Sequence, residues 1–310
     1  MTSLVWSYSE SVDTANELSS AANQIANATA GQSAVLEIGR PRDGVRANNK
    51  LVLKTDTNPP YTCEVVSELI YRAVQKFKPS MILVGSTRQR REVAGRLAAK
   101  MGAGSMTEAF ELRVSGQMLL GSRNVYAGRV VAQMSAPFPC VATVRIGAYP
   151  SQTAAGARIQ EFEAGDVPTR IKILRATKKE SGRIDLRKAK TVVSVGRGIK
   201  KKEDLAMVEG LAKSMGAALG CSRPLSSDLG WLPEECHIGL TGISVSPELY
   251  LAIGISGQLQ HVAGIKDSKV IAAINSDKDA PIFQAADYGI VGDLYQLVPA
   301  IQRALAAKKS

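Results

Sequence analysis

The chain carries few side chains that could catalyse a reaction by acid–base or nucleophilic chemistry. Only two histidines, His237 and His261, occur among its 310 residues. The sequence contains no GxSxG nucleophile elbow, no HExxH zinc motif and no GxxxxGK[ST] phosphate loop. The sequence therefore lacks the motifs that hydrolysis by a catalytic triad or by a zinc ion requires. This scarcity favours a protein in which a bound cofactor carries out the chemistry.

The segment Gly196-Arg197-Gly198 follows an apolar run and precedes a helical pattern, which is where a dinucleotide-binding turn would lie. Lys201 breaks the full GxGxxG pattern, and a simple tight turn explains the two glycines equally well. Arg197 has a physical use at this position nevertheless. Ligands of open α/β sheets bind outside the carboxyl ends of the strands, where a guanidinium can form paired hydrogen bonds with a pyrophosphate.

The Gly-Ile-Ser-Gly segment at residues 254–257 is a stronger indication of a ligand site. It follows the strongest predicted strand, residues 249–253, and opens a short helical pattern. Two glycines allow the backbone to approach a ligand closely, and N–H groups at the start of a helix favour negative charge. His261 would add a cation within the first turn of that helix. The alternative is a glycine turn followed by an ordinary polar histidine.

Two further segments, residues 221–224 (Cys-Ser-Arg-Pro) and 239–242 (Gly-Leu-Thr-Gly), have the composition of loops. Between them lies Trp-Leu-Pro at residues 231–233. The arginine and the two hydroxyl groups in these loops could line a site for an aromatic ligand that forms hydrogen bonds.

Strand-like and helical patterns alternate along the chain, and this places the glycine segments at strand ends. In the first half, we expect strands at residues 35–38, 81–84, 141–144 and 172–174, and helices around 67–74 and 92–101. In the second half, we expect strands at residues 191–195, 249–253, 269–274 and 288–291, and helices over 205–215 and 294–306. The alternation predicts an α/β fold with two domains, each a mostly parallel sheet flanked by helices.

Basic residues are concentrated in one segment, residues 170–202, which holds 13 basic and two acidic residues and so accounts for the net charge of +11. The segment contains no aromatic residue for base stacking and no groove-reading motif, which favours a solvated connector over a nucleic-acid site. We therefore expect an amino-terminal α/β domain over residues 1–188, with a basic connector at about 170–190. A second domain is expected over residues 189–310.

Composition excludes several classes of protein. With 45% apolar and 22% charged residues, the chain has the content of a folded domain and not of a disordered one. No apolar run approaches the roughly 18 residues of a membrane helix, and the amino-terminal residues lack the pattern of an export signal. The four cysteines show no CxxC spacing, which argues against a structural zinc site. We expect thiols in a reducing cytoplasm and no insertion into a membrane.

The stretch from residue 195 to residue 306 resembles the carboxyl-terminal, FAD-binding domain of the electron transfer flavoprotein alpha subunit. The resemblance is carried, in order, by VGRGI at 195–199, CSRP at 221–224, GLTG at 239–242, PELYLAIGISGQLQH at 247–261, INSD at 274–277 and APIFQAADYGIVGD at 280–293. The amino-terminal half resembles the family more loosely, chiefly at residues 79–97. The resemblance thus covers most of the chain.

This resemblance implies a Rossmann-like second domain that binds FAD. Carried over by position, the flavin and its pyrophosphate would contact Arg197, Ser222, Arg223, Ile238, Gly239, Leu240, Thr241, Ser256, Gly257, Gln258, Leu259, Gln260 and His261. Asn275 and Asp293, with the adjacent Leu294, match the positions that reach the adenosine half.

The family also implies roles for single residues. His261 and the helix start after Gly257 would stabilise negative charge near the flavin N1 and O2 atoms, Arg223 would place a cation beside the ring, and Thr241 would hydrogen bond near N5. Leu240 departs from the family, which usually has glutamine there, so any contact from that side chain is lost. A further substitution, Gln258 for the commoner alanine, matches the FixB-like branch.

The implied function is that of an electron carrier and not of a classical enzyme. It would accept electrons from acyl-CoA or other dehydrogenases and pass them to a quinone oxidoreductase or another redox acceptor. The implied partner is a beta subunit that carries AMP or, in bifurcating members, a second FAD. Three alternatives stay open from the sequence: a FixB-like subunit that bifurcates electrons from NADH, an NAD-dependent enzyme on a similar fold, and a nucleic-acid binder that uses residues 170–202.

Overall fold

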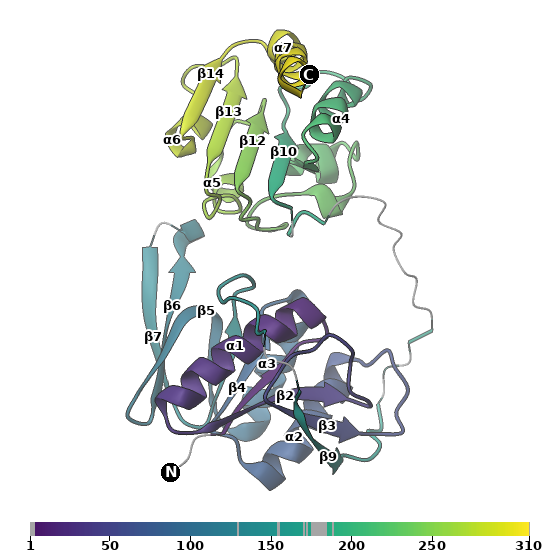
Figure 1. Ribbon diagram of the computed structural model, residues 1–310, viewed down its shortest axis with the longest axis vertical. Helices are drawn as coiled ribbons and strands as arrows, with labels where there is room; N and C mark the ends of the chain where they lie inside the picture. Colours follow the sequence, from purple (N-terminus) through teal and green to yellow (C-terminus); the bar gives the residue numbers. More distant parts are fainter. Residues whose placement is uncertain are drawn as a thin grey trace. The chain divides into compact units, whose positions relative to one another are not determined.

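The computed structural model describes residues 4–128, 130–153, 156–169, 171, 173–174, 185–187 and 189–309. The chain divides into two compact units between Thr177 and Lys178 (Figure 1). The boundary expected near residue 188 lies C-terminal to this division. Each unit has its own sheet, as the predicted fold class requires, and the expectation of two mostly parallel α/β sheets is confirmed.

The elements of the first unit are β1 (Leu4–Tyr8), α1 (Val12–Ala28), β2 (Gln32–Ile38), β3 (Asn49–Lys54), α2 (Cys63–Phe77), β4 (Met81–Gly85), α3 (Arg88–Met101), β5 (Gly104–Ser115), β6 (Met118–Val125), the turn η1 (Tyr126–Gly128), β7 (Val130–Pro137), β8 (Cys140–Val144) and β9 (Arg158–Glu163). They alternate between strands and helices except between β2 and β3 and from β5 onward, where strands follow one another without an α-helix. Among the described residues their sheet has nine strands, in the order β7-β6-β5-β8-β4-β1-β2-β3-β9.

Most neighbours in this sheet are parallel, but β6 is antiparallel to both β5 and β7. The pattern of residue types gave no indication of this antiparallel extension. A strand was also predicted at residues 172–174. The described residues Ile173 and Leu174 are not in a strand, so that prediction is wrong for them, and Lys172 lies outside the described residues. The edge strand of the parallel sheet is instead β9, which lies parallel to β3. Residue 158 of β9 is paired with residue 49 of β3.

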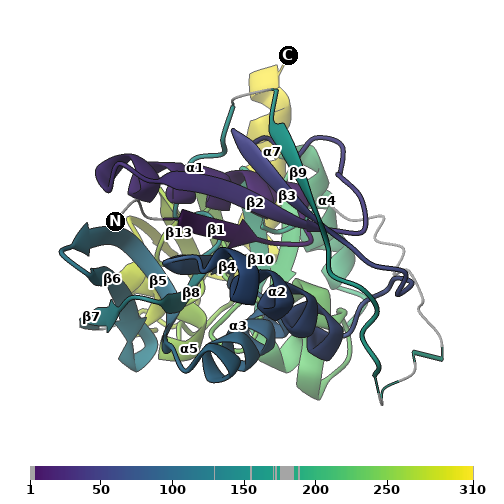
Figure 2. The same cartoon turned by 90° about the horizontal axis from the view of Figure 1, so that it is seen from below.

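Helices cover both faces of the first sheet (Figures 1 and 2). On one face, α1 packs Leu18 and Ala22 against Val5 and Leu83 of the central strands. On the other, α2 and α3 pack against Trp6 and its neighbours. Both α2 and α3 begin at a threonine, Thr62 and Thr87, whose hydroxyl accepts a hydrogen bond from a backbone N–H of the first turn. The sequence thus sets where each helix begins.

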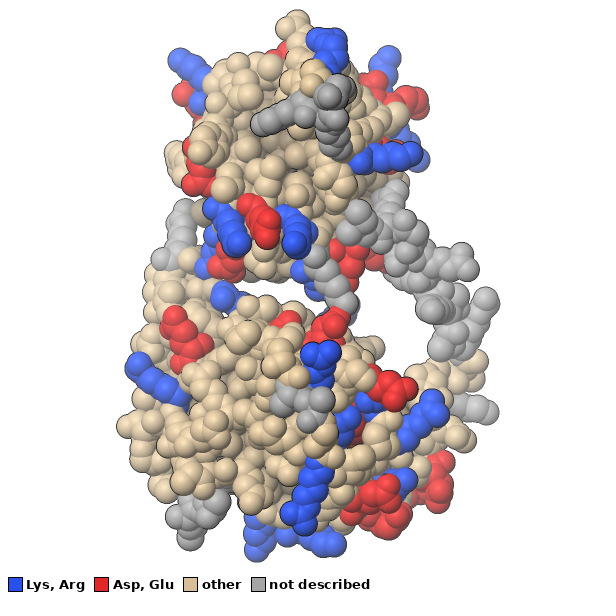
Figure 3. All heavy atoms as spheres, in the orientation of Figure 1, with Lys and Arg blue, Asp and Glu red and all other residues tan. Residues whose placement is uncertain are grey.

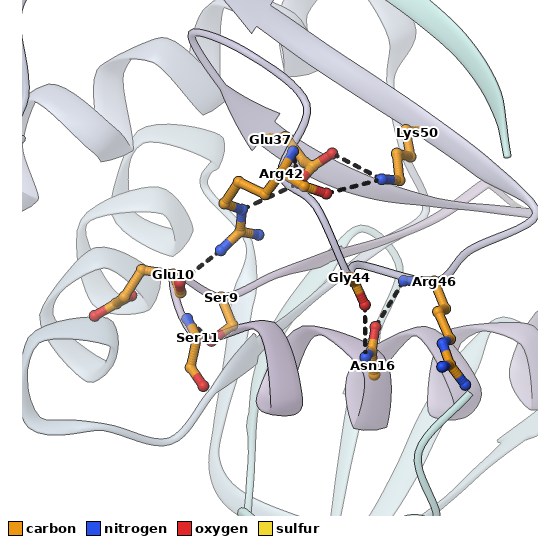
Figure 4. Close-up of polar contacts among 9 residues, drawn as sticks. All are labelled: Ser9, Glu10, Ser11, Asn16, Glu37, Arg42, Gly44, Arg46 and Lys50. Carbon is orange, nitrogen blue, oxygen red and sulfur yellow. Dashed lines mark hydrogen bonds and ion pairs between the residues drawn. The ribbon is translucent and has the colours of Figure 1, made fainter. Parts of the chain in front are cut away.

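A buried polar network fixes the loops beyond the carboxyl end of β2 (Figure 4). The carboxylate of Glu37, whose side chain is fully buried, accepts from Nε of Arg42 at 3.0 Å and lies 3.4 Å from Nζ of Lys50. Arg42 also donates through Nη1 to the backbone oxygen of Glu10. The side chain of Asn16 on α1 donates to the Gly44 carbonyl and accepts from a backbone N–H in the same loop. These contacts join β2, β3 and α1 at one edge of the sheet.

The second unit has a parallel sheet of five strands within the described residues, in the order β11-β10-β12-β13-β14. Its elements are β10 (Thr191–Val195), α4 (Leu205–Ser214), β11 (Ala218–Cys221), the turns η2 (Pro224–Asp228) and η3 (Glu234–Cys236), β12 (Leu249–Ile253), α5 (Leu259–Val262), β13 (Ile271–Asn275), α6 (Ile282–Ala285), β14 (Tyr288–Val291) and α7 (Leu294–Lys309).

Two cores sandwich this second sheet. On one face, Val208 of α4 and Val298 of α7 pack with Val193 and Ile253 of the central strands. On the other, Ile282 of α6 joins a cluster around the remaining strand residues. Leu186 is already buried in that second cluster, so the chain enters the core of this unit just before β10.

Candidate functional site

A cavity of about 560 Å³ lies at the carboxyl ends of the strands of the second unit. This is where open parallel sheets bind ligands. The cavity gathers twelve of the sixteen expected site residues: Arg197, Ser222, Arg223, Ile238, Gly239, Leu240, Thr241, Ser256, Gln258, Gln260, His261 and Asn275. They come from the segments that follow β10, β11, β12 and β13, which explains why residues so far apart in the sequence meet.

Four expected residues do not line the cavity: Gly257, Leu259, Asp293 and Leu294. Asp293 accepts a hydrogen bond from the backbone N–H of Tyr295 in the first turn of α7. Leu294 is buried in the core. The observed contacts of Asp293 and Leu294 stabilise the fold. Contact of the four residues with a ligand stays a prediction.

The glycines around β10 and β12 pack backbone against backbone, a role that the sequence interpretation did not include. Gly198 and Gly254 also line the cavity, so the approach of a ligand there stays a prediction. The N–H of Gly198 donates to the Gly254 carbonyl at 2.9 Å, and a Cβ on Gly198 would lie 2.6 Å from the Gly254 Cα. Gly257 has φ of +82°, and a Cβ there would lie 2.2 Å from the backbone nitrogen of Ile282. After Gly198 the helix α4 begins only at Leu205, so this turn is not the start of a dinucleotide-binding helix.

The loop of residues 237–243 forms one wall of the cavity because it packs directly on α5. The N–H of Leu240 donates to the Gln260 carbonyl at 2.7 Å. A Cβ on Gly264 would lie 2.7 Å from the Gly239 backbone, so only glycine fits there. The side chain of Leu240, which departs from the family pattern, is 58% exposed at this wall.

Two guanidinium groups supply positive charge to the cavity. Arg197 and Arg223 both line it and are both exposed. Neither forms an ion pair with a carboxylate among the described residues of the second unit. Such cations favour an anionic ligand, since Arg binds phosphate and carboxylate oxygens through paired hydrogen bonds.

Burial disfavours the charged form of His261, the form that would act as a cation in the cavity. Its ring is buried, and Nε2 lies 2.8 Å from Oη of Tyr250 on β12. Burial lowers the pKa of His261 to about 4, with a further lowering by His237, while a hydrogen bond to the backbone of Ile238 acts in the opposite direction. The helix α5 that carries His261 spans only Leu259–Val262, so a helix dipole adds little there.

Sequence reasoning missed two polar residues of the cavity, His237 and Asp277. His237 is buried, and burial lowers its pKa; Glu234 opposes this shift and Arg223 adds to it. His237 is one of only two histidines in the chain, and both line the same cavity. The rarity of this residue type was therefore a signal that could have identified His237. Asp277 lies two residues after the end of β13, where strand-end reasoning applies.

We expect the second unit to lose stability as the pH falls from about 6.5 towards 4. Both histidines have folded-state pKa values below the ordinary 6.5, so the unfolded chain binds more protons in this range and is favoured by acid. Urea unfolding of a Trp6→Phe variant, followed by Trp231 fluorescence, would measure this loss. The loss should be smaller in His261→Gln. An equal loss in that variant would assign the pH dependence to other groups.

Two family models match the chain. The model described as "Electron transfer flavoprotein domain" matches residues 9–169, and the "Electron transfer flavoprotein FAD-binding domain" model matches residues 185–266. The electron transfer flavoprotein subunit alpha of Mycobacterium leprae is 36% identical over 90% of this chain and 91% of its own length. The chain belongs to the electron transfer flavoprotein alpha subunit family. The resemblance found in the sequence is thereby confirmed.

Other relatives cover slightly less of the chain. Protein FixB of Escherichia coli (strain 55989 / EAEC) is 38% identical over 73% of this chain and 74% of its own length. The subunit alpha of Syntrophomonas wolfei is 38% identical over 82% of this chain and 81% of its own length. Members of this family pair with a beta subunit. In this chain, no helix among the described residues has the length and apolar character needed to cross a membrane.

The second unit is the FAD-binding domain of the electron transfer flavoprotein, and its cavity suits that cofactor. About 560 Å³ falls within the range of ligand pockets, roughly 300–1,000 Å³. Arg197 and Arg223 offer donors for phosphate oxygens, and the hydroxyl groups of Ser222, Thr241 and Ser256 offer further polar contacts. The donor set therefore suits the anionic pyrophosphate of this cofactor.

Proposed function

We propose that this chain takes up electrons from acyl-CoA or other dehydrogenases and delivers them to a quinone-linked or other redox acceptor, as the FAD-carrying half of a heterodimer. Family membership supports the flavin and the pairing with a beta subunit. When bound, FAD supplies the capacity to accept and release electrons, which no side chain of the cavity has. A reducing cytoplasm suits this role and suits the four cysteines, which form no disulfide.

The observation that carries the proposal is the pair of exposed guanidinium groups at a cavity with few acid–base residues. Arg197 would bind the pyrophosphate, and Arg223 would lie beside the flavin and favour its reduced, more negative forms. Thr241 would hydrogen bond to the ring, and Asn275 would reach the adenosine half. In the present structure, Asn275 donates to the Ile255 carbonyl at 2.9 Å, which fixes its side chain at the cavity edge.

The first unit would serve as scaffold and as docking surface for the beta subunit, which carries AMP or a second FAD. On the face drawn in Figure 3, the Lys and Arg side chains of the described residues are interspersed with Asp and Glu. Mixed charge of this kind differs from the continuous basic stripe that marks a nucleic-acid site.

Replacing Arg223 with alanine should lower the midpoint potential of the bound FAD. The loss of a cation beside the ring disfavours the more negative reduced forms, and about 1.4 kcal/mol of lost stabilisation corresponds to roughly 30 mV in a two-electron couple. Spectroelectrochemistry on the heterodimer measures this. Arg303→Ala on α7 is the matched control, because it removes the same charge away from the cavity lining.

An unchanged potential in Arg223→Ala would remove that residue from the flavin environment. A purified heterodimer without bound flavin, or one that dehydrogenases cannot reduce, would contradict the proposed function itself.

A further inference from the structure

Tyr295, in the first turn of α7, bonds through its hydroxyl group to the loop between β10 and α4. The backbone N–H of Lys200 donates to Oη of Tyr295 at 2.8 Å, and this hydroxyl donates in turn to the carboxylate of Asp204 at 2.7 Å. The ammonium of Lys200 also lies 5.5 Å from the centre of the Tyr295 ring, within the range of a cation–π contact. We call the contacts among Lys200, Tyr295 and Asp204 the Tyr295 clamp.

The carboxylate of Asp204 is used for this clamp and not for its own helix. Asp204 occupies the N-cap position of α4, where an aspartate commonly accepts a hydrogen bond from a backbone N–H of the first turn. Its side chain forms no such capping bond here. Since a backbone N–H only donates and a carboxylate only accepts, the Tyr295 hydroxyl satisfies both groups at once. The clamp therefore joins both ends of the segment 200–204 to α7.

The clamped loop begins with the turn that carries Arg197 at the edge of the cavity. The next residue, Gly198, donates its N–H to the Gly254 carbonyl, and a Cβ on Gly198 would lie 3.2 Å from Cδ2 of Leu294 on α7. Ile199 is buried in the same core cluster as Leu294. The backbone that follows Arg197 is thus held by α7 over three consecutive residues, while the Arg197 side chain is exposed at the cavity.

We propose that Tyr295 is a positioning residue for the cofactor cavity, and that its hydroxyl holds the loop after β10 so that Arg197 lies where a pyrophosphate binds. This inference rests on the proposed function, because FAD supplies that pyrophosphate. A cation that is already held in place loses less conformational freedom on binding, so the clamp raises the affinity. Tyr295 is not among the residues that line the cavity, so it acts only through the loop.

The test is a double-mutant cycle of Tyr295→Phe and Arg197→Ala, with the affinity of the heterodimer for FAD as the readout. Both substitutions lie in this chain, so a change in affinity reports on its own cofactor site. Tyr295→Phe removes one oxygen and keeps the ring that packs in the core of the unit. We expect it to weaken FAD binding about tenfold, the effect of one or two lost hydrogen bonds.

In the Arg197→Ala background, Tyr295→Phe should weaken FAD binding by about twofold or less, because the group that Tyr295 positions is gone. A merely structural role of Tyr295 would weaken binding equally in both backgrounds, and that result would overturn the proposal. An unchanged affinity in Tyr295→Phe alone would overturn it as well.

Two further variants control for the substitution. Tyr288→Phe removes the same oxygen from an exposed tyrosine on β14 of the same unit and should leave the affinity unchanged. Asp204→Ala removes the acceptor of the Tyr295 hydroxyl without removing a capping bond, so it should weaken FAD binding in the same direction as Tyr295→Phe. Wild-type affinity in Asp204→Ala, or an equal loss in Tyr288→Phe, contradicts the clamp.

Amide hydrogen exchange of the full chain without flavin tests the clamp separately from the cofactor. The Lys200 N–H should exchange at least about tenfold faster in Tyr295→Phe than in the wild type, while the amides of the buried strand β10 keep their rates. If the exchange result holds and the heterodimer binds no FAD, the proposed function fails and the clamp stands. If FAD binds and the exchange of Lys200 is unchanged, the clamp fails and the proposed function stands.

Discussion

Replacing Glu37 with alanine is expected to lower the free energy of unfolding of the first unit by about 3–5 kcal/mol. The substitution removes the carboxylate that compensates Arg42 and Lys50, and the Lys50 side chain is only 9% exposed. A buried ammonium without a counter-charge is costly, whereas water partly compensates an exposed one. The same carboxylate also accepts from the backbone N–H of Arg42, so the loop that follows β2 loses an anchor as well.

Glu161→Ala provides a matched control in the same unit. Glu161 pairs with Lys54 at 3.1 Å, but these side chains are 55% and 34% exposed, and such surface pairs contribute about 0–1 kcal/mol. Trp6 is buried in the first unit and Trp231 lies in the second, so urea unfolding in a Trp231→Phe background reports on the first unit alone. Equal losses in the two variants would show that the Glu37 network does not stabilise the unit.

Gly257→Ala should destabilise the second unit by roughly 2–5 kcal/mol and reduce its FAD content. The residue has φ of +82°, which costs an L-residue about 1–2 kcal/mol, and the new Cβ would lie 2.2 Å from the nitrogen of Ile282. Overpacking of this kind adds about 1–3 kcal/mol. The N–H of Ile282 donates to the Ser256 carbonyl, so the clash falls on the bond that holds Ser256 at the cavity.

Gly216→Ala separates the two effects. Gly216 has φ of +62° with no atom within 4 Å of an added Cβ, so only the backbone strain should appear. Urea unfolding followed by Trp231 fluorescence gives the stability, and visible flavin absorbance per chain gives the FAD content. If both glycine variants lose the same stability and keep their flavin, close packing at Gly257 has no part in forming the cavity wall.

The sequence was informative about the fold wherever a strand is buried on both faces. All residues of β4 and β8 are buried, and their continuous apolar runs identified them. The antiparallel strands β5, β6 and β7 escaped because exposed and half-buried residues dominate them. In β5, Glu108 and Glu111 have positive φ. The alternation of residue types does not predict this backbone irregularity. Propensity is a weak guide to such edge structure.

For the site, the sequence located most of the cavity but not every contact that shapes it. Strand-end reasoning and the family resemblance together found Arg197 and Arg223, which line it. The packing role of the glycines was hidden, because nothing in a linear sequence shows that Gly198 and Gly254 touch each other. The contact between Tyr250 and His261 was equally hidden, because only the folded chain brings these two side chains together.

The pairing of β9 with β3 has a consequence for the order in which the protein is made. The ribosome synthesises the chain from its amino terminus, so β3 waits while the 103 residues between Lys54 and Arg158 are made before β9 can pair with it. Until then Leu51 and Leu53 lie in a strand with one unpaired edge. Contacts between residues so far apart in the sequence slow folding. Until β9 is made, the nascent chain exposes an unpaired strand edge that is prone to aggregation. A truncation just before residue 158 should therefore yield aggregates, and chaperones should bind the growing chain in that interval.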